Sequence, residues 1–380
     1  MVTIFIFIAV LLLLCDSYIF FGVLSSCPLW AKCLFAVPSL IYIAVILYML
    51  FTTDVGQKSL NFLFWLTLCI VIPTLIFTIF SLLGKGIGLV FPSVVKIVNY
   101  IALLCSLVWF GISLYGILFG WKKIEVTRVT INSEKIPDSF RGYKIVQLSD
   151  FHIGTYASAP GCVDRIVDRV NSLNPDLIVF TGDLVNSSSN EIKEFSHVLS
   201  RLHAKDGVYS VLGNHDYCLY RKYQGNDTPA KQLAEVINYE NKVGWKLLRN
   251  ESVKITQGND TLDLVGVDNA GSGAFPDKSD LNKAMKETSA TRYKILLSHD
   301  PSHWRREVLP ESDIDLMLAG HTHAMQFKIG EWSPSSWVYP EWGGLYEQDG
   351  RKLYVSTGIG ENVAFRFGAW PQIVEITLNK

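Results

Sequence analysis

The chain has 380 residues, enough for more than one domain. Its formal net charge of −1 provides no overall attraction to a polyanion, so composition argues against nucleic acid as a partner. Hydrophobic residues make up 49% of the chain, and charges are scarce before about residue 120. This split predicts a membrane part joined to an ordinary globular part.

Four apolar stretches, at residues 3–24, 29–51, 60–83 and 94–120, come first along the chain. A helix crosses a bilayer with roughly 20 apolar residues, so each stretch is long enough to span. The first has no basic start and three more follow it, which argues against a cleaved signal peptide. The short connections predict an up-and-down bundle, with a kink at Pro73 in the third helix. We therefore expect a four-helix transmembrane anchor at residues 1–121 and a globular domain at residues 122–380.

Basic residues near the helix ends indicate the orientation of the anchor. Four lie on the side of the globular domain: Lys58, Lys122, Lys123 and Arg128. Three lie on the other side: Lys32, Lys85 and Lys96. This count favours a globular domain on the cytoplasmic side. Only Asp16 is charged deep within a span, so an anchor is favoured over a channel or transporter.

The globular part alternates apolar strands with helices. Strands are predicted at residues 122–131, 143–149, 175–180, 208–212, 294–299 and 314–319, and helices at residues 161–173 and 191–203. This alternation predicts an α/β fold of packed layers. Ligands in such folds collect beyond the carboxyl ends of the strands.

Polar side chains that can bind metals follow five of these strands. They are Asp150, His152, Asp183, Asn214, His299, His321 and His323. All are oxygen or imidazole-nitrogen donors, which suit Mn, Fe or Zn, and no cysteine joins them. Seven ligands are too many for one tetrahedral ion, but they fit two ions roughly 3.5–4 Å apart that share a carboxylate. Gly182 and Gly320 allow tight backbone turns beside them.

The order of these motifs is specific. Asp150-Phe151-His152, Gly182-Asp183, Gly213-Asn214-His215-Asp216, Ser298-His299 and Gly320-His321-Thr322-His323 resemble the signature of the calcineurin-like metallophosphoesterase superfamily, over about residues 145–377. The resemblance implies a four-layer αββα sandwich with a dinuclear metal centre.

The resemblance also implies a role for each residue. One ion would bind Asp150, His152, Asp183 and His323, and the other would bind Asp183, Asn214, His299 and His321, with Asp183 as the bridge. His215 would act as a non-ligand acid or contact the substrate phosphate, and Asp216 would orient that histidine.

Within the superfamily the chain is most similar to the membrane-anchored YkuE/YaeI-type phosphodiesterases, which are related to the UDP-2,3-diacylglucosamine pyrophosphohydrolases of lipid A synthesis. The segments 353–360 and 365–367 resemble the ending of that subgroup. Subgroup members often have two glycines after the Gly-His-Thr-His motif, where this chain has Ala324 and Met325.

These features predict a phosphohydrolase with two divalent metal ions, Mn foremost and Fe, Zn or Co as alternatives. Two cations neutralise phosphoryl oxygens and lower the pKa of a bound water toward about 7. His215 is placed to protonate the leaving oxygen; the alternative is a purely electrostatic contact with the phosphoryl group.

The anchor favours a phosphodiester or pyrophosphate substrate on a lipid or nucleotide-linked lipid, at a bacterial inner membrane. Alternative substrates are soluble nucleotides and phosphoproteins. Two rival functions remain: a metal-bearing scaffold without turnover, and a transporter or sensor that the hydrolase regulates.

Three further features are left with two interpretations each. Residues 331–346, the aromatic insert, predict either a lid that admits a lipid tail or docks on the membrane, or a satellite of the core under a long loop. Arg366 is either a substrate-phosphate contact or a surface arginine. The loop at residues 217–230 either selects substrate or is a solvated connection.

Overall fold

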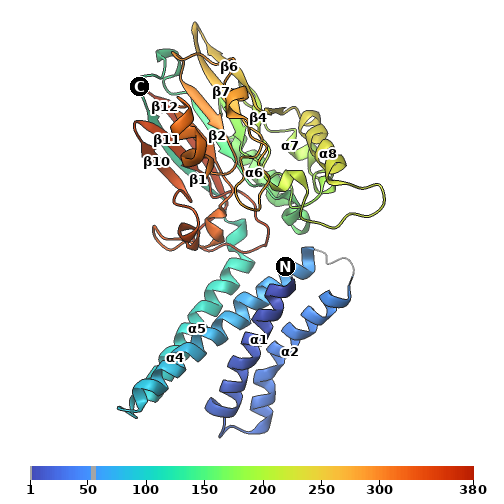
Figure 1. Cartoon of the computed structure of the whole chain (residues 1–380), viewed down its shortest axis with the longest axis vertical. Coiled ribbons are helices and arrows are strands. Elements are labelled where there is room, and N and C mark those ends of the chain that lie inside the picture. The colour runs from blue at the N-terminus through green and yellow to red at the C-terminus, as the bar shows by residue number, and fades with distance from the viewer. Residues whose placement is uncertain (1, 53–56) are drawn as a thin grey trace. The chain divides into compact units, whose positions relative to one another are not determined.

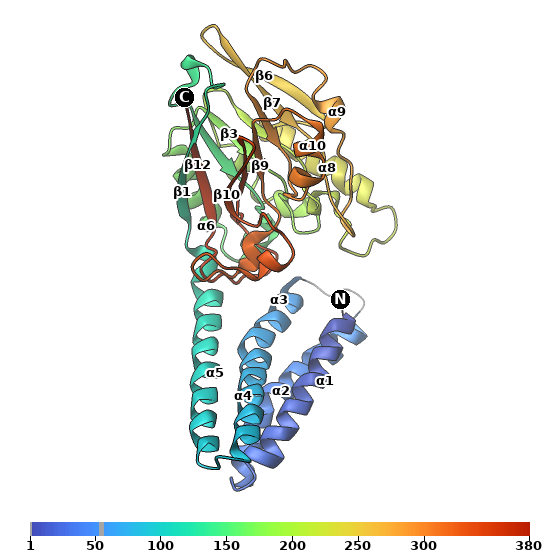
Figure 2. The same ribbon diagram turned by 60° about the vertical axis from the view of Figure 1, so that its left-hand side comes forward.

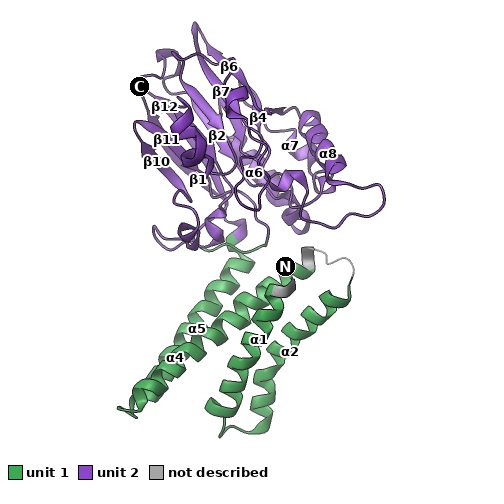
Figure 3. Cartoon of the chain, in the orientation of Figure 1, with its two compact units in different colours: residues 1–120, 363–367 green, residues 121–362, 368–380 purple. Residues whose placement is uncertain are grey.

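The computed structural model describes residues 2–52 and 57–380. The chain forms two compact units, shown in green and purple in Figure 3. The helical unit comprises Met1–Gly120 and Val363–Phe367, and the catalytic unit comprises Trp121–Asn362 and Gly368–Lys380.

The helical unit contains four segments that are long and apolar enough to cross a membrane, which confirms the four predicted spans (Figure 1). Its helices are α1 (Val2–Tyr18), α2 (Leu29–Phe51), α3 (Gln57–Leu66), α4 (Ile72–Gly88) and α5 (Val94–Leu118). A π-helical turn at Ile19–Val23 extends α1, and α3 and α4 form one span, Ser59–Gly88, that is longer than predicted.

The third span is interrupted near Pro73, where a kink was expected. A second π-helical turn, Thr67–Val71, joins α3 to α4, and Pro73 stands at the start of α4. Proline has no N–H to donate to the preceding turn and its ring crowds that turn, so a locally wider helix accommodates it.

The helical unit also includes one short segment from late in the sequence, Val363–Phe367. The Trp65 indole donates to the Ala364 carbonyl (3.0 Å), and the Arg366 N–H donates to the Gly116 carbonyl (3.3 Å). Phe365 lies against Gly116, where any larger residue would collide with its ring. The absence of a side chain at Gly116 therefore lets this segment pack closely on α5.

The catalytic unit is built on two six-stranded sheets. The first has the order β1 (Glu125–Asn132), β12 (Gln372–Asn379), β2 (Lys144–Leu148), β3 (Leu177–Phe180), β4 (Val208–Ser210) and β5 (Lys246–Leu247). The second has the order β10 (Gly344–Gln348), β11 (Arg351–Val355), β9 (Leu316–Ala319), β8 (Lys294–Leu297), β7 (Asp260–Gly266) and β6 (Glu251–Gln257).

The sheets face each other across the main apolar core, and helices cover their outer faces (Figure 2). The core includes Ile145 and Leu177 from the first sheet and Ile295 and Leu318 from the second. The helices are α6 (Gly161–Asn171), α7 (Ser196–Leu199), α8 (Pro229–Lys242), α9 (Leu281–Ala284) and α10 (Leu309–Glu311). This is the predicted four-layer α/β sandwich.

The helix predicted at residues 191–203 is wrong in extent. The structure has a 3-10 turn at Ser189–Ile192 and only the four-residue α7 after it. The Ser196 hydroxyl bonds back to the Lys193 carbonyl and the Ser200 hydroxyl to the His197 carbonyl. Such local side-chain bonds compete with a continuous helical ladder, so the segment stays short.

Candidate metal centre

The predicted ligands stand on the turns that follow β2, β3, β4, β8 and β9. Parallel strands bring their carboxyl ends to one edge of a sheet, which gathers residues that are far apart in sequence. Five of these residues have left-handed backbone conformations, an uncommon state for residues other than glycine. They are Asp150 (φ 52°), His152 (φ 42°), Asp183 (φ 61°), His321 (φ 74°) and His323 (φ 50°).

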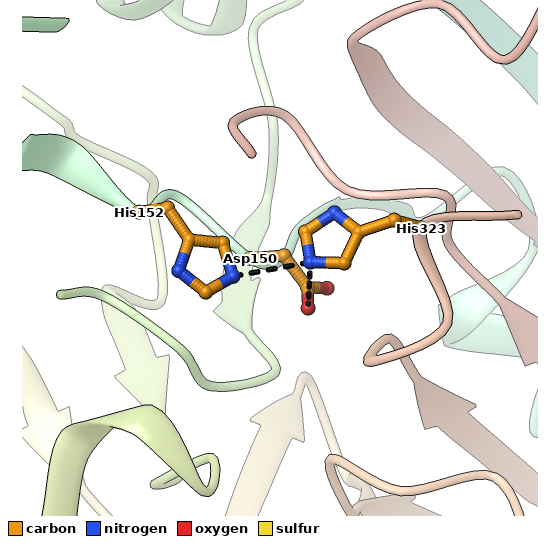
Figure 4. Close-up of side chains that lie close together, drawn as sticks. All are labelled: Asp150, His152 and His323. Atoms are coloured by element: carbon orange, nitrogen blue, oxygen red, sulfur yellow. Dashed lines mark hydrogen bonds and ion pairs between the residues drawn. The ribbon is translucent and has the colours of Figure 1, made fainter. Parts of the chain in front are cut away.

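The first cluster consists of Asp150, His152 and His323, all buried (Figure 4). His152 Nε2 lies 3.1 Å from His323 Nε2, and His323 Nε2 lies 3.3 Å from Asp150 Oδ1. Donors bound at about 2.1 Å to one ion are separated by about 3.0–3.5 Å. The spacing of these three atoms therefore fits a shared cation.

The second cluster consists of Asp183, His299 and His321. His299 Nε2 lies 3.1 Å from Asp183 Oδ2 and 3.2 Å from His321 Nδ1. His299 Nδ1 bonds to the Thr181 carbonyl at 2.8 Å, which turns Nε2 toward the cluster. Asp183 Oδ2 is also 3.6 Å from His152 Nε2, so this carboxylate faces both clusters.

Asn214 is buried beside Asp183. Its Nδ2 donates to the Tyr220 hydroxyl at 2.8 Å. No described residue hydrogen-bonds its Oδ1. A buried amide oxygen is normally satisfied, so this orphaned acceptor fits a metal ligand.

The electrostatics of the clusters favour cations. Burial, followed by the charge of a neighbouring histidine, lowers the pKa of His152 to about 3 and that of His321 to about 4. Burial also raises the pKa of Asp150 to about 6, although the charge of His299 opposes this. Unprotonated imidazoles can donate to a metal, and a cation would stabilise a carboxylate that burial otherwise penalises.

Asp183 and His299 form a buried ion pair. Burial would raise the Asp183 pKa, but His299 and then His215 hold it well below its ordinary value. Burial would lower the His299 pKa, but the charge and hydrogen bond of Asp183 raise it to about 10. A metal ion at this place would therefore compete with the proton on His299.

Glycines permit the close approach of the turns. A side chain at Gly320 would collide with Ser149 and Asp150, and one at Gly360 would collide with the Phe151 carbonyl. Gly182 has φ 93° and also lies against Gly213. The tight turns predicted at Gly182 and Gly320 are present.

His215 lies beside both clusters. Its N–H donates to Asp183 Oδ1 (2.7 Å), and its ring lies 4.7 Å from the His152 ring. Its Nδ1 is 2.6 Å from the Asn186 carbonyl. A carbonyl oxygen can only accept a hydrogen bond, so Nδ1 carries the proton. Nε2 is then the nitrogen that can exchange a proton with another group.

The role expected for Asp216 needs correction. Its carboxylate accepts the backbone N–H groups of Asp183, Leu184 and Gly213, each at 2.8 Å. The Asn186 carbonyl, and not Asp216, holds the His215 ring. Asp216 therefore supports the turn that carries Asp183, and burial followed by the charge of Asp183 raises its pKa to about 7.

Arg366 is fully buried, which excludes the surface-arginine alternative. It belongs to Val363–Phe367 in the helical unit, whereas the clusters belong to the catalytic unit. Its contact with substrate phosphate stays a prediction.

The aromatic insert is buried in part and exposed in part, and its role as a lipid lid or membrane contact stays a prediction. Trp342 packs with Ala324 and Ala369 in a small buried cluster. Trp332 and Trp337 form an edge-on pair 5.6 Å apart and are 42% and 77% exposed. One half of the insert is thus core and the other half is an exposed apolar surface.

Sequence reasoning did not identify two residues near the clusters, Tyr220 and Tyr339. Each lies in a loop rather than a strand-end motif, and each hydroxyl contacts a predicted ligand. Their only sequence signal is their position, Tyr220 six residues after Asn214 and Tyr339 within the aromatic insert.

The two-sheet sandwich thus carries clusters of histidine and aspartate that suit metal ions, as in a metallophosphoesterase domain. The Calcineurin-like phosphoesterase family profile matches residues 143–325, and the profile described as "Probable Calcineurin-like phosphoesterase, transmembrane domain" matches residues 2–121. The chain therefore combines a calcineurin-like phosphoesterase domain with a four-helix phosphoesterase transmembrane domain.

Curated relatives include membrane proteins. The Bos taurus "Transmembrane protein with metallophosphoesterase domain" is 30% identical over 70% of this chain and 60% of its own length. YkuE of Bacillus subtilis is 29% identical over 67% of this chain and 85% of its own. "UDP-2,3-diacylglucosamine pyrophosphatase LpxG" of Chlamydia trachomatis is 27% identical over 66% and 88%. The match thus spans about 60% of the length of the vertebrate relatives.

Among solved structures, a dimetal phosphatase from Danio rerio aligns with 60% of this chain and 90% of its own at 13% identity and a TM-score of 0.33. The sulfate thiohydrolase SoxB of Thermus thermophilus aligns with 64% of this chain and 57% of its own at 12% identity and a TM-score of 0.37.

Proposed function

We propose that this integral membrane protein hydrolyses a phosphodiester or pyrophosphate bond with two divalent metal ions, on a lipid or nucleotide-linked lipid. The observation that carries this proposal is a pair of metal-binding clusters with the Asp183 carboxylate facing both, and with His215 beside them. One ion would be held by Asp150, His152, Asp183 and His323, and the other by Asp183, Asn214, His299 and His321. Mn²⁺ is the proposed ion, because oxygen and imidazole donors suit it.

In this proposal the bound cations neutralise the phosphoryl oxygens and supply an ionised water at neutral pH. The protein contributes proton transfer and orientation. The Asn186 carbonyl fixes His215 with Nδ1 protonated. When His215 is doubly protonated, its Nε2–H can be given to the leaving oxygen, and the remaining neutral ring keeps its bond to Asn186.

Three observations support a lipid-linked substrate. The helical unit holds four spans, and one relative is named as a pyrophosphatase of a nucleotide-linked, diacylated sugar. The exposed Trp332, Trp337 and Val338 also lie in the same insert as Tyr339, whose hydroxyl is 2.9 Å from His321 Nε2. An acyl chain resting on this apolar surface would lead directly to the metal centre.

The substrate class can be tested with the full-length protein in detergent, reconstituted with Mn²⁺. We expect turnover to be fastest on lipid pyrophosphates or glycerophosphodiesters among a panel that includes nucleotides and a phosphopeptide, and a His152→Ala variant to lose it. Preference for the nucleotides or the phosphopeptide would overturn the lipid assignment. Two bound ions with no turnover on any compound would favour the non-catalytic scaffold.

The contribution of the insert has its own test. Trp337→Ser should raise KM for a long-chain ester and leave KM unchanged for a short-chain ester with the same headgroup, because only the long chain reaches the apolar surface. Equal effects on the two esters would contradict an acyl-chain contact.

We also propose that the catalytic unit faces the cytoplasm at a bacterial inner membrane. The excess of basic residues at Lys122, Lys123 and Arg128 supports this orientation. A phosphatase-type reporter that is active only outside the cytoplasm, fused after Lys380, should stay inactive. An active reporter would reverse the topology.

A further inference from the structure

Two tyrosine hydroxyls contact two side chains of the proposed second cation site. Asn214 Nδ2 donates to the Tyr220 hydroxyl at 2.8 Å. His321 Nε2 lies 2.9 Å from the Tyr339 hydroxyl. Both side chains belong to the proposed second cation site, which consists of Asp183, Asn214, His299 and His321.

Tyr220 determines which end of the Asn214 amide faces the cluster. An asparagine binds a cation through its oxygen, and the amide can be turned either way. Because Nδ2 is engaged by Tyr220, Oδ1 is directed elsewhere, and no described residue hydrogen-bonds it. The Tyr220 hydroxyl therefore selects the orientation that a metal ion requires.

Tyr339 determines which nitrogen of His321 is available. His321 Nδ1 lies 3.2 Å from His299 Nε2, inside the cluster, and Nε2 points to Tyr339. If Nε2–H donates to the Tyr339 hydroxyl, the lone pair of the neutral ring is on Nδ1, directed at the cation. Partners of this kind commonly set the tautomer and orientation of metal-bound histidines.

Both tyrosines stand outside helices and strands. Tyr220 lies in the loop before α8, is 42% exposed and packs its ring 4.4 Å from the His215 ring. Tyr339 lies in the aromatic insert. By contrast, His299 is held by the backbone carbonyl of Thr181. Two ligands of the second site thus depend on side chains from two loops.

We propose that Tyr220 and Tyr339 are positioning residues that set the affinity of the second cation site. This inference rests on the proposed dinuclear centre. It makes occupancy of the second site responsive to the same loops that would contact the substrate.

The test is Mn²⁺ titration of metal-free, full-length protein by calorimetry, with ion content measured after gel filtration. Tyr220→Phe and Tyr339→Phe remove only the hydroxyls. Each substitution should raise the Mn²⁺ dissociation constant of one of the two binding steps by roughly 10–100-fold. The other step should keep its wild-type dissociation constant. With Co²⁺ at saturation, the visible absorption of each variant should also differ from wild type, because the ligand geometry at one ion has changed.

Matched controls lie close by in the sequence: Tyr223 is in the same loop as Tyr220, and Tyr346 is in β10, at the end of the aromatic insert. The Tyr223 hydroxyl donates to the Cys218 carbonyl, and the Tyr346 hydroxyl accepts the Trp342 N–H at 3.1 Å. Neither touches a predicted ligand, so Tyr223→Phe and Tyr346→Phe should bind both ions as wild type does.

Three results would contradict the inference: two wild-type binding steps in both test variants, equal weakening of both steps, or the same loss in the controls. A wild-type protein that takes up fewer than two ions would instead refute the dinuclear centre itself. The two failures are therefore distinguishable.

Discussion

At the scale of single residues, the candidate centre is held in strained backbone. Asp150, His152, Asp183, His321 and His323 all have positive φ. Each such residue costs on the order of 1–3 kcal/mol and persists only where its surroundings fix it. The carboxylate of Asp216 is one such support, because three N–H groups of the surrounding turns converge on it at 2.8 Å.

His215 gives the first prediction. If it protonates the leaving oxygen, His215→Ala should bind metals normally and turn over roughly 10²–10⁴-fold more slowly. The loss should shrink for an ester of p-nitrophenol, which leaves without much protonation. The comparison is between kcat on this ester and on an alkyl ester, in wild type and variant.

The same two rates distinguish the alternative role. A histidine that only contacts the phosphoryl group would lose similar factors on both esters. Unchanged rates on both would remove His215 from the chemistry.

Glu240 gives a prediction about pH and stability. It is fully buried on α8, its carboxylate accepts from the Ser210 hydroxyl, and burial raises its pKa from 4.5 to about 8. Between these values the unfolded state releases a proton that the folded state keeps. The free energy of unfolding therefore falls as pH rises, by up to about 1.4 kcal/mol per pH unit.

Glu240→Gln cannot titrate and should lack this fall. Thermal unfolding of both proteins at pH 5 and pH 8 measures the effect. The glutamine variant should gain stability relative to wild type at the higher pH. A difference that is constant with pH would show that Glu240 is already ionised in the folded protein.

At the scale of elements, the turn after β9 departs from what the sequence favours. Ala324, Met325 and Gln326 have φ of 51°, 44° and 59°, in the left-handed region that glycine adopts most readily. A residue with a side chain is strained in this region, whereas glycine is not.

Met325→Gly should therefore stabilise the protein by about 0.5–1 kcal/mol, since Met325 is 46% exposed and little packing is lost. Ala324→Gly is the control, because the buried Ala324 methyl packs with Trp342 and its loss offsets the gain. Denaturant unfolding measures both. Lower stability in Met325→Gly would mean that its side chain contributes more than the strain costs.

The elements nearest the site were the most predictable from sequence. β2, β3, β8 and β9 are short, mostly apolar and largely buried runs that are followed by polar residues, so both the strand and the position of its ligands can be predicted. The hairpin of β6 and β7 was not predicted, because β6 is largely polar and exposed. The partners of Asp216 depend on the backbone angles of a tight turn, which residue types do not reveal.

At the scale of the whole molecule, the chain combines a membrane domain with a hydrolase domain. The helical unit is made of two separate segments of the sequence. Val363–Phe367 packs with the helices although it lies near the C-terminus. Ala364 and Phe365 are buried there. The segment was not predicted to do this, because its four aromatic and aliphatic side chains also suit a globular core.

This division predicts the behaviour of the isolated fragment 122–380. It should bind two ions, because both clusters lie within it. It should also aggregate, since Phe365 loses the surface of α5, and Phe365→Ser should improve its solubility. The same substitution in the full-length protein should lower thermal stability. Sedimentation and metal analysis measure these outcomes, and a metal-free but folded fragment would contradict the placement of the centre.

The central claim is that one carboxylate joins two metal ions in the hydrolytic site. The most direct measurement is the Mn²⁺ content and phosphodiester hydrolysis of full-length Asp183→Ala beside wild type, both purified in the same detergent and reconstituted alike. We predict two ions per chain and metal-dependent turnover in wild type, and loss of both tightly bound ions together with turnover in the variant. Two retained ions, or undiminished hydrolysis, in Asp183→Ala would contradict the account.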